Sequence, residues 1–251
     1  MAFVIPGFYF LIGVCLGSFG SVLITRFARE RRSIRGRSRC LGCMRVLRLW
    51  ELIPVVSYMV LRGKCARCRK HIGILYPCPE LFSGVLFVLA FIHDPQPIPS
   101  LLLGIALWLL LIIAITDVFE HAIPDIFSVT LAVVGLTLCA YTRQNPLGAI
   151  ILGAGFFGVL WLLSRGTWIG SGDVILGGAI GTVLGDWRLM LACLFLTYVV
   201  GAVISSALLV TGRAHRKSAV AFGPFLALGT LMTILWRTRI IEGAAVYFGI
   251  Y

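Results

Sequence analysis

The chain has 251 residues, of which 59% are hydrophobic and 13% charged. Charged residues make up about a quarter of an ordinary soluble domain, so this composition argues against a soluble globular protein and indicates that lipid surrounds most of the chain. Runs such as 101–116 and 147–163 contain no ionised side chain and approach the roughly 20 residues that a helix needs to cross a bilayer. They are apolar on every face, whereas strands of a membrane barrel alternate apolar and polar residues. An all-α fold is therefore predicted.

Taken in chain order, the apolar runs predict a polytopic membrane protein of about eight transmembrane helices. We expect these helices at 3–25, 74–93, 100–116, 126–141, 147–164, 174–185, 189–211 and 219–236. The first run resembles a secretory signal in length, but no basic region precedes it and no small-residue cleavage pattern follows it. It is therefore expected to remain as a span, and lipid is the expected neighbour of all eight.

The formal net charge of +12 is concentrated near the N-terminus. Residues 26–70 contain fourteen Lys or Arg and two acids. Short basic loops stay on the cytoplasmic side during insertion, so we expect this loop to be cytoplasmic, together with segments 117–125, 165–173 and 212–218. A nucleic-acid footprint would also be basic, but membrane topology explains the charge, and no nucleic-acid partner is predicted.

Four of the eight cysteines form two CxxC pairs within the basic loop, Cys40 with Cys43 and Cys65 with Cys68. Two such pairs separated by about 15–20 residues are typical of a tetrahedral zinc site. Two redox motifs or a disulfide pair are the alternatives, and a cytoplasmic location argues against stable disulfides. We predict a structural Zn²⁺ bound by the four cysteines, because four ligands leave no open position for catalysis.

Glycines repeat every four residues in the predicted sixth span, at Gly177, Gly181 and Gly185. This spacing places them on one helix face and permits close approach of a neighbouring helix. The sixth span is therefore expected to be central.

The few acids outside the basic loop cluster at the ends of predicted spans. Asp117 closes the third span, Asp125 follows it, and Asp173 opens the sixth in Gly170-Ser-Gly-Asp173. Under the predicted topology Asp117 and Asp173 meet at one depth. Two adjacent carboxylates share a proton, so that one can activate water while the other polarises a scissile carbonyl, as in aspartic proteases.

Each acid also has a simpler explanation. Asp173 after a glycine-rich turn, or Asp125 after Pro124, could be a helix N-cap, and Asp117 could be a solvated loop end. Two acids that meet in a lipid-buried chain favour the catalytic interpretation. Gly170 and Gly172 flank Asp173 with flexible backbone, which would let a substrate strand approach closely.

A set of short motifs runs in one order along nearly the whole chain. They are Gly17-Ser18-Phe19, the two CxxC pairs, Ile53-Pro54 with Ser57, Leu61-Arg62-Gly63-Lys64-Cys65, Tyr76-Pro77 with Glu80, Asp117 eight residues before Asp125, Gly170-Ser-Gly-Asp173 and Phe222-Gly-Pro-Phe225. In this order the set resembles the bacterial type IV prepilin peptidases, which are intramembrane aspartic proteases of the GxGD class.

The resemblance implies that Asp117 and Asp173 are the catalytic pair, with Asp125 as a neighbour. It implies pilin-like precursors as substrates, cut on the cytoplasmic side of the bacterial inner membrane, and for many members a second step that N-methylates the product with S-adenosylmethionine. We expect a single polytopic domain over residues 1–251, with the cysteine loop at 26–73 and the peptidase core helices at 100–236.

The chain departs from the family pattern at several positions. It has Ser21, Glu51-Leu52, Leu75 and Ile175 where the pattern usually has Asn, Asp-Asn, Arg and Lys. The first three departures bear on methylation and the last on the peptidase site. The rival functions are a non-catalytic zinc-bearing assembly factor for pilin-like proteins and a transporter with a carboxylate proton relay, for which we see no repeated segment.

Overall fold

The computed structural model describes residues 4–25, 38–40, 42–74, 76–212 and 221–248. Within these residues it is helical with no β-strand, so the all-α prediction is confirmed. Much of the basic run at the start of the loop, the segment with Arg213, Arg216 and Lys217, and Leu75 lie outside the described residues. The chain divides into two compact units, Met1–Gly104 and Ile105–Tyr251, which are described separately.

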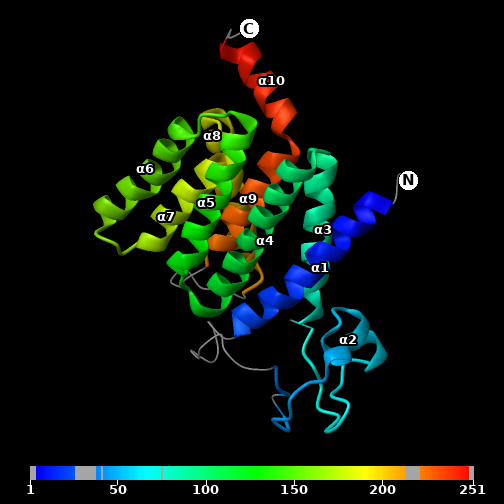
Figure 1. Cartoon of the computed structure of the whole chain (residues 1–251). Coiled ribbons are helices and arrows are strands. Elements are labelled where there is room, and N and C mark those ends of the chain that lie inside the picture. Colours follow the sequence, from blue (N-terminus) through cyan, green and yellow to red (C-terminus); the bar gives the residue numbers. More distant parts are fainter. Residues whose placement is uncertain (1–3, 26–37, 41, 75, 213–220, 249–251) are drawn as a thin grey trace. The chain divides into compact units, whose positions relative to one another are not determined.

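The first unit contains α1 (Val4–Ile24), η2 (Leu49–Leu52), α2 (Val56–Val60), α3 (Pro77–His93) and the start of α4 (Pro97–Glu120). Helices α1 and α3 pack closely and lie side by side in Figure 1. A Cβ added at Gly17 would lie 2.6 Å from the Cα atom of Glu80, so only glycine permits this approach. Near the start of α1, Tyr9 shares a hydrogen bond of 2.6 Å with Ser100.

The second unit contains the rest of α4, α5 (Asp125–Thr142), α6 (Leu147–Ser164), α7 (Ser171–Leu184), α8 (Trp187–Val210), α9 (Gly223–Leu235) and α10 (Arg237–Phe248). Helix α7 packs against both α5 and α6, as the glycine repeat predicts. A Cβ at Gly181 would lie 2.6 Å from the Ala149 carbonyl oxygen. The third glycine of the repeat, Gly185, instead ends α7 with φ +69°. Glycine is favoured here because residues with a side chain rarely adopt this left-handed conformation.

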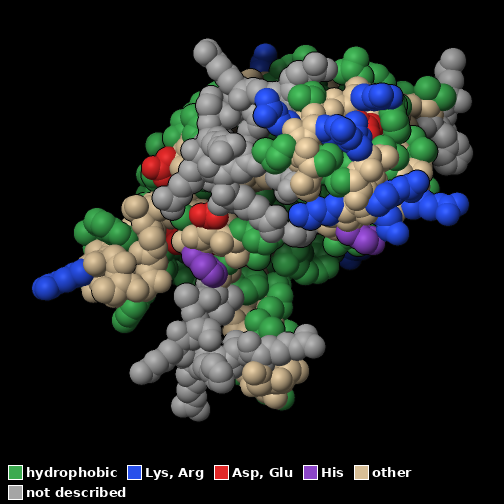
Figure 2. All heavy atoms as spheres, turned by 90° about the horizontal axis from the view of Figure 1, so that it is seen from below, with side chains coloured by type: hydrophobic (Ala, Val, Ile, Leu, Met, Phe, Trp, Pro, Cys, Tyr) green, Lys and Arg blue, Asp and Glu red, His purple; other side chains and the backbone are tan. Residues whose placement is uncertain are grey.

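Among the residues that the structure describes, five helices are long and apolar enough to cross a membrane: α1, α4, α5, α6 and α8. The chain is therefore a multi-pass membrane protein. The predicted spans at 74–93, 174–185 and 219–236 correspond to α3, α7 and α9, which have 17, 14 and 13 residues. A count of eight spans is thus not confirmed. Figure 2 shows Lys and Arg side chains gathered beside hydrophobic ones on the face seen from below.

Candidate active site and metal centre

Asp117 lies in the last turn of α4 and is only 6% exposed. No charged residue precedes it in this helix. Its Oδ2 atom accepts a hydrogen bond of 2.7 Å from the backbone N–H of Gly223, at the start of α9. The first N–H groups of a helix have no partner within the helix, so this amide is free to bind a carboxylate.

Gly223 approaches Asp117 so closely that a side chain at position 223 would displace the carboxylate. A Cβ at this position would lie 2.9 Å from Asp117 Oδ2 and 3.2 Å from Asp117 Cβ. From the sequence, Phe222-Gly-Pro-Phe225 predicts only a break at the start of a span. The structure adds a contact with Asp117 that sequence reasoning missed, and its one signal was a glycine placed at a helix N-terminus before Pro224.

Asp173 is the third residue of α7, and Gly170, not Asp173, is the N-cap. The Gly170 N–H donates to Asp173 Oδ2 at 3.2 Å, while the Asp173 N–H donates to the Gly170 carbonyl at 3.2 Å. This reciprocal pair resembles a capping box. The other carboxylate oxygen, Oδ1, is buried and has no hydrogen-bond partner among the described residues.

The two glycines beside Asp173 have different surroundings. Gly170 is extended, with φ −74° and ψ 155°, a conformation open to any residue. A Cβ at Gly172 would lie 3.2 Å from Ile123 Cβ, so this glycine lets α7 pack against the segment between α4 and α5. The structure therefore gives Gly172 a packing role beside the carboxylate.

Asp117 and Asp173 act on each other electrostatically, although they lie in different helices. Tyr198 of α8 also lies in the field of Asp173. The Tyr198 ring is 5.6 Å from that of Phe222, the residue before Gly223. Helices α4, α7, α8 and the start of α9 thus converge on one place, with the two carboxylates and an aromatic wall.

Asp125 does not cap α5. The structure places Pro124 at the N-cap and Asp125 at the first helical position, where its side chain makes no capping hydrogen bond and is exposed. The N-cap interpretation is wrong because the chain enters the helix one residue earlier. Pro124 is itself extended, with φ −67° and ψ 120°, and occupies the N-cap position. A carboxylate in the first turn still interacts favourably with the helix dipole.

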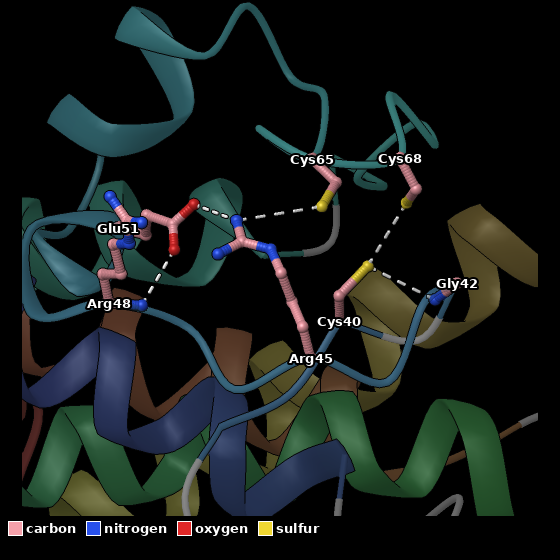
Figure 3. Close-up of polar contacts among 7 residues, drawn as sticks. All are labelled: Cys40, Gly42, Arg45, Arg48, Glu51, Cys65 and Cys68. Atoms are coloured by element: carbon pink, nitrogen blue, oxygen red, sulfur yellow. Dashed lines mark hydrogen bonds and ion pairs between the residues drawn. The ribbon is translucent and has the colours of Figure 1, made fainter.

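The four loop cysteines come together in the structure. The Sγ atoms of Cys40, Cys43, Cys65 and Cys68 all lie within 4.8 Å of one another. Those of Cys40 and Cys68 are 3.7 Å apart, and both side chains point into the same space in Figure 3. Zinc–sulfur bonds of 2.3 Å in a tetrahedron require sulfurs about 3.8 Å apart. The donor set and its spacing fit a metal ion of this kind.

The two CxxC pairs have the same backbone design. The Cys40 N–H donates to the Arg45 carbonyl at 2.9 Å, and the Cys65 N–H donates to the Lys70 carbonyl at 3.0 Å. The residue after each second cysteine, Met44 or Arg69, has a positive φ of 55° or 57°, which is uncommon for these residue types. Two equivalent tight turns thus present two sulfurs each.

The thiols differ in how easily they lose a proton. Backbone N–H groups, that of Cys68 first, lower the pKa of Cys65 to about 6. The Lys70 amide lowers the pKa of Cys68, but burial and the neighbouring sulfurs outweigh it and raise that pKa to about 11. Ionisation of one thiol therefore makes ionisation of its neighbours less favourable. A divalent cation would replace the protons and stabilise the thiolates together.

Arg45 connects the cysteine turns to a buried acid. Its guanidinium forms an ion pair with Glu51 and lies 4.0 Å from Cys65 Sγ (Figure 3). The second Glu51 oxygen accepts from the Arg48 N–H at 2.8 Å. Although burial opposes it, this pairing lowers the pKa of Glu51. Glu51 stands where the family pattern usually has Asp, so a carboxylate is kept at this position, and it orients Arg45 toward the sulfurs.

Comparison with known proteins shows the family of the chain. A family model described as the type IV leader peptidase family matches residues 104–206, and one described as the bacterial peptidase A24 N-terminal domain matches residues 11–93. A prepilin leader peptidase/N-methyltransferase of Bacillus subtilis (strain 168) is 32% identical over 241 residues, which cover 93% of this chain and 95% of that protein. The chain belongs to the type IV prepilin leader peptidase family.

Other members of the prepilin leader peptidase family are similar over shorter lengths. A protein of the same name from Legionella pneumophila is 31% identical over 216 residues, 82% of this chain and 74% of that protein. One from Burkholderia pseudomallei (strain 1026b) is 36% identical over 211 residues, 80% of this chain and 68% of that protein. No solved structure matches the chain. The peptidase match contains Asp117 and Asp173, whereas Gly223 lies beyond its end.

Proposed function

We propose that the chain is an aspartic endopeptidase that removes the leader of pilin-like precursors, with Asp117 and Asp173 as its catalytic pair. The observation that carries the proposal is the convergence of two carboxylates from different helices. One of them is oriented by a backbone amide, and the other has a buried oxygen without a partner among the described residues. A purely structural acid would have its oxygens satisfied.

The hydrogen bonds of the two carboxylates suggest a different role for each. A backbone N–H can only donate, so Asp117 Oδ2 must accept, which suits the ionised form. The unpartnered Oδ1 of Asp173 can carry the proton that the pair shares. Titration belongs to the pair as a unit, and this division describes the form that starts the reaction.

In the resulting mechanism, Asp117 takes a proton from water as the water oxygen attacks the scissile carbonyl carbon. Asp173 gives its proton to the carbonyl oxygen, which forms a tetrahedral diol. Collapse of the diol breaks the C–N bond, and the proton held by Asp117 passes to the leaving amine. Asp173 recovers its proton from the diol hydroxyl, and both carboxyl groups return to their starting states.

The family and the charge distribution support a proposal for the substrate and for the location of the enzyme. The relatives are named prepilin leader peptidases, so we propose type IV pilin-like precursors as substrates. Fourteen basic residues against two acids in residues 26–70 favour a cytoplasmic loop. With it, the ends of α4 and α7 that bear Asp117 and Asp173 would face the cytoplasm, and the enzyme would reside in the bacterial inner membrane.

We assign the peptidase to the helices at 100–236. A structural Zn²⁺ is assigned to the loop 26–73, where its ligands would be Cys40, Cys43, Cys65 and Cys68. Both parts belong to one polytopic domain over residues 1–251. The metal would supply a cross-link that holds the two turns together. N-methylation is supported by the names of the relatives. S-adenosylmethionine is proposed as the methyl donor from the family resemblance alone, and we assign none of the described residues to this step. Asp125 is given no step in the reaction.

Co-expression with candidate precursors, read by loss of the leader on a gel, tests the proposal. Wild-type membranes should process a precursor, whereas Asp117→Asn and Asp173→Asn should not. Asp186→Asn is the matched control, because Asp186 caps α8 through the Arg188 N–H at 2.7 Å and Asn caps equally well. Processing by Asp173→Asn at the control rate would favour the assembly-factor function instead.

A further inference from the structure

In the part of the cysteine loop at residues 49–60, the apolar side chains are exposed and the charged side chain is buried. Leu49, Met59 and Val60 are 80%, 70% and 68% exposed, and further apolar side chains beside them are exposed as well. The single charged residue in this stretch, Glu51, is 7% exposed and paired. A loop solvated by water would expose the charge and bury the apolar side chains. We call residues 49–60 the apolar segment.

A hydrogen bond fixes the depth of the apolar segment relative to the helices of its own unit. The backbone N–H of Val55 donates to Glu80 Oε2 at 2.7 Å. Glu80 lies in the first turn of α3, against Gly17 of α1, and α1 is one of the candidate spans. Since the end turns of membrane helices lie near the boundary between hydrocarbon and headgroups, the apolar segment is held at that boundary.

Basic side chains bracket the apolar segment. Arg48 precedes it, Arg62 and Lys64 follow it, and all three are exposed. Basic residues next to a membrane helix attract anionic lipid, and Trp is enriched at the headgroup level, where Trp50 would lie.

We propose that the apolar segment is an interfacial anchor that inserts into the surface of an anionic bilayer. The side chains of Leu49, Met59 and Val60 lie among the acyl chains, while Arg48 and Arg62 contact lipid phosphates. Lipid fits better than the apolar helix of a protein partner, because the basic bracket needs phosphates at the same depth. The anchor is independent of the peptidase activity, and it holds the metal-binding turns against the membrane.

The test uses the full chain in nanodiscs that carry nitroxide groups on their acyl chains, made either of phosphatidylcholine alone or with added phosphatidylglycerol. The chain has 6 Trp, so the difference between wild type and Trp50→Phe isolates the emission of Trp50. We expect this emission to be quenched by the nitroxide in discs with phosphatidylglycerol, and about twofold less in discs without it.

Variants distinguish insertion from proximity. The double variant Met59→Asp with Val60→Asp changes exposed positions, so it should keep its metal content and lose the quenching of Trp50. His71→Asp adds a carboxylate elsewhere on the exposed loop and should leave the quenching unchanged. Absence of quenching in both lipids, or quenching that survives the double variant, overturns the anchor. Equal quenching in both lipids overturns its anionic preference, and a Trp50 shift seen only on adding a precursor assigns the segment to a protein partner.

Discussion

The aspartates of the second unit and the cysteines of the first are positioned by different parts of the chain. Asp117 and Asp173 are 56 residues apart in sequence and lie in different helices, and a backbone amide more than 100 residues from Asp117 orients it. The cysteines are presented by two local turns whose shape is set within six residues. The first arrangement depends on tertiary packing, and the second depends on what the sulfurs bind.

This difference predicts which variants affect chemistry and which affect folding. The packing around the aspartates exists before substrate arrives, so a change of one carboxylate should leave the helices intact. The loop offers few buried side chains, and its two described turns meet through the cysteine sulfurs and the contact of Arg45 with Cys65. The predictions below test this contrast, from the largest expected effect to the smallest.

The largest effect should come from the aspartates. Asp117→Asn and Asp173→Asn should each lower processing by about a thousandfold or more, and the double variant should lose no more than either one, because groups that act as a unit are non-additive. Rates in membranes that carry equal amounts of each protein measure this. Losses that multiply in the double variant would mean that the two residues act separately.

The next effect concerns the glycine that touches Asp117. In Gly223→Ala the new Cβ meets the end of the carboxylate, which can rotate away, so the protein should fold but lower kcat by about 10–100-fold with little change in KM. The matched control is Gly155→Ala, since a Cβ there meets nothing within 4 Å. A normal kcat in Gly223→Ala would show that the Gly223 amide has no part in the mechanism.

Loss of the metal should affect the loop more than the peptidase. Purified protein should contain one zinc, and Cys40→Ser with Cys65→Ser should contain none, with faster proteolysis of the loop because the metal and the fold are coupled. Acidification should also release the metal, since protons compete for the thiolates. Elemental analysis and limited proteolysis measure both outcomes, with Cys15→Ser as the control outside the cluster. Full zinc content in the double variant would contradict the assigned ligands.

A smaller effect should follow loss of the ion pair beside the sulfurs. Glu51→Gln removes the anion that orients Arg45, and the affinity for zinc should fall by about tenfold, as is typical of groups that support metal ligands. Competition with a chelator measures the affinity. Because the pairing lowers the pKa of Glu51, the contribution is present at neutral pH and is lost as the pH falls through that lowered value. An unchanged affinity would leave Glu51 with a packing role.

The smallest effect is expected at Asp125. Asp125→Asn should change processing by less than about twofold, because the side chain is exposed, makes no capping bond, and only its interaction with the helix dipole is weakened. The same precursor assay measures it. A loss as large as that of Asp173→Asn would give Asp125 a step in the reaction.

Much of this arrangement could be predicted from the sequence because lipid imposes a simple pattern. Apolar runs separated by short polar segments predicted the bounds of the membrane helices to within a few residues. The CxxC spacing predicted the cysteine cluster. Helix α10 was missed because Arg237, Arg239 and Glu242 interrupt its apolar pattern. The Gly223 amide could not be predicted, since every residue except proline has an N–H and only the packing decides which one meets Asp117.

The shortness of α7 has a consequence for the supply of water. Its 14 residues make a helix about 21 Å long, whereas the hydrocarbon core of a bilayer is about 30 Å thick. Lipid around such a helix must thin, or solvent must enter at its ends. Asp173 lies in the first turn, so in a bilayer this hydrophobic mismatch would bring the aqueous phase toward the carboxylate to which we assign the hydrolysis.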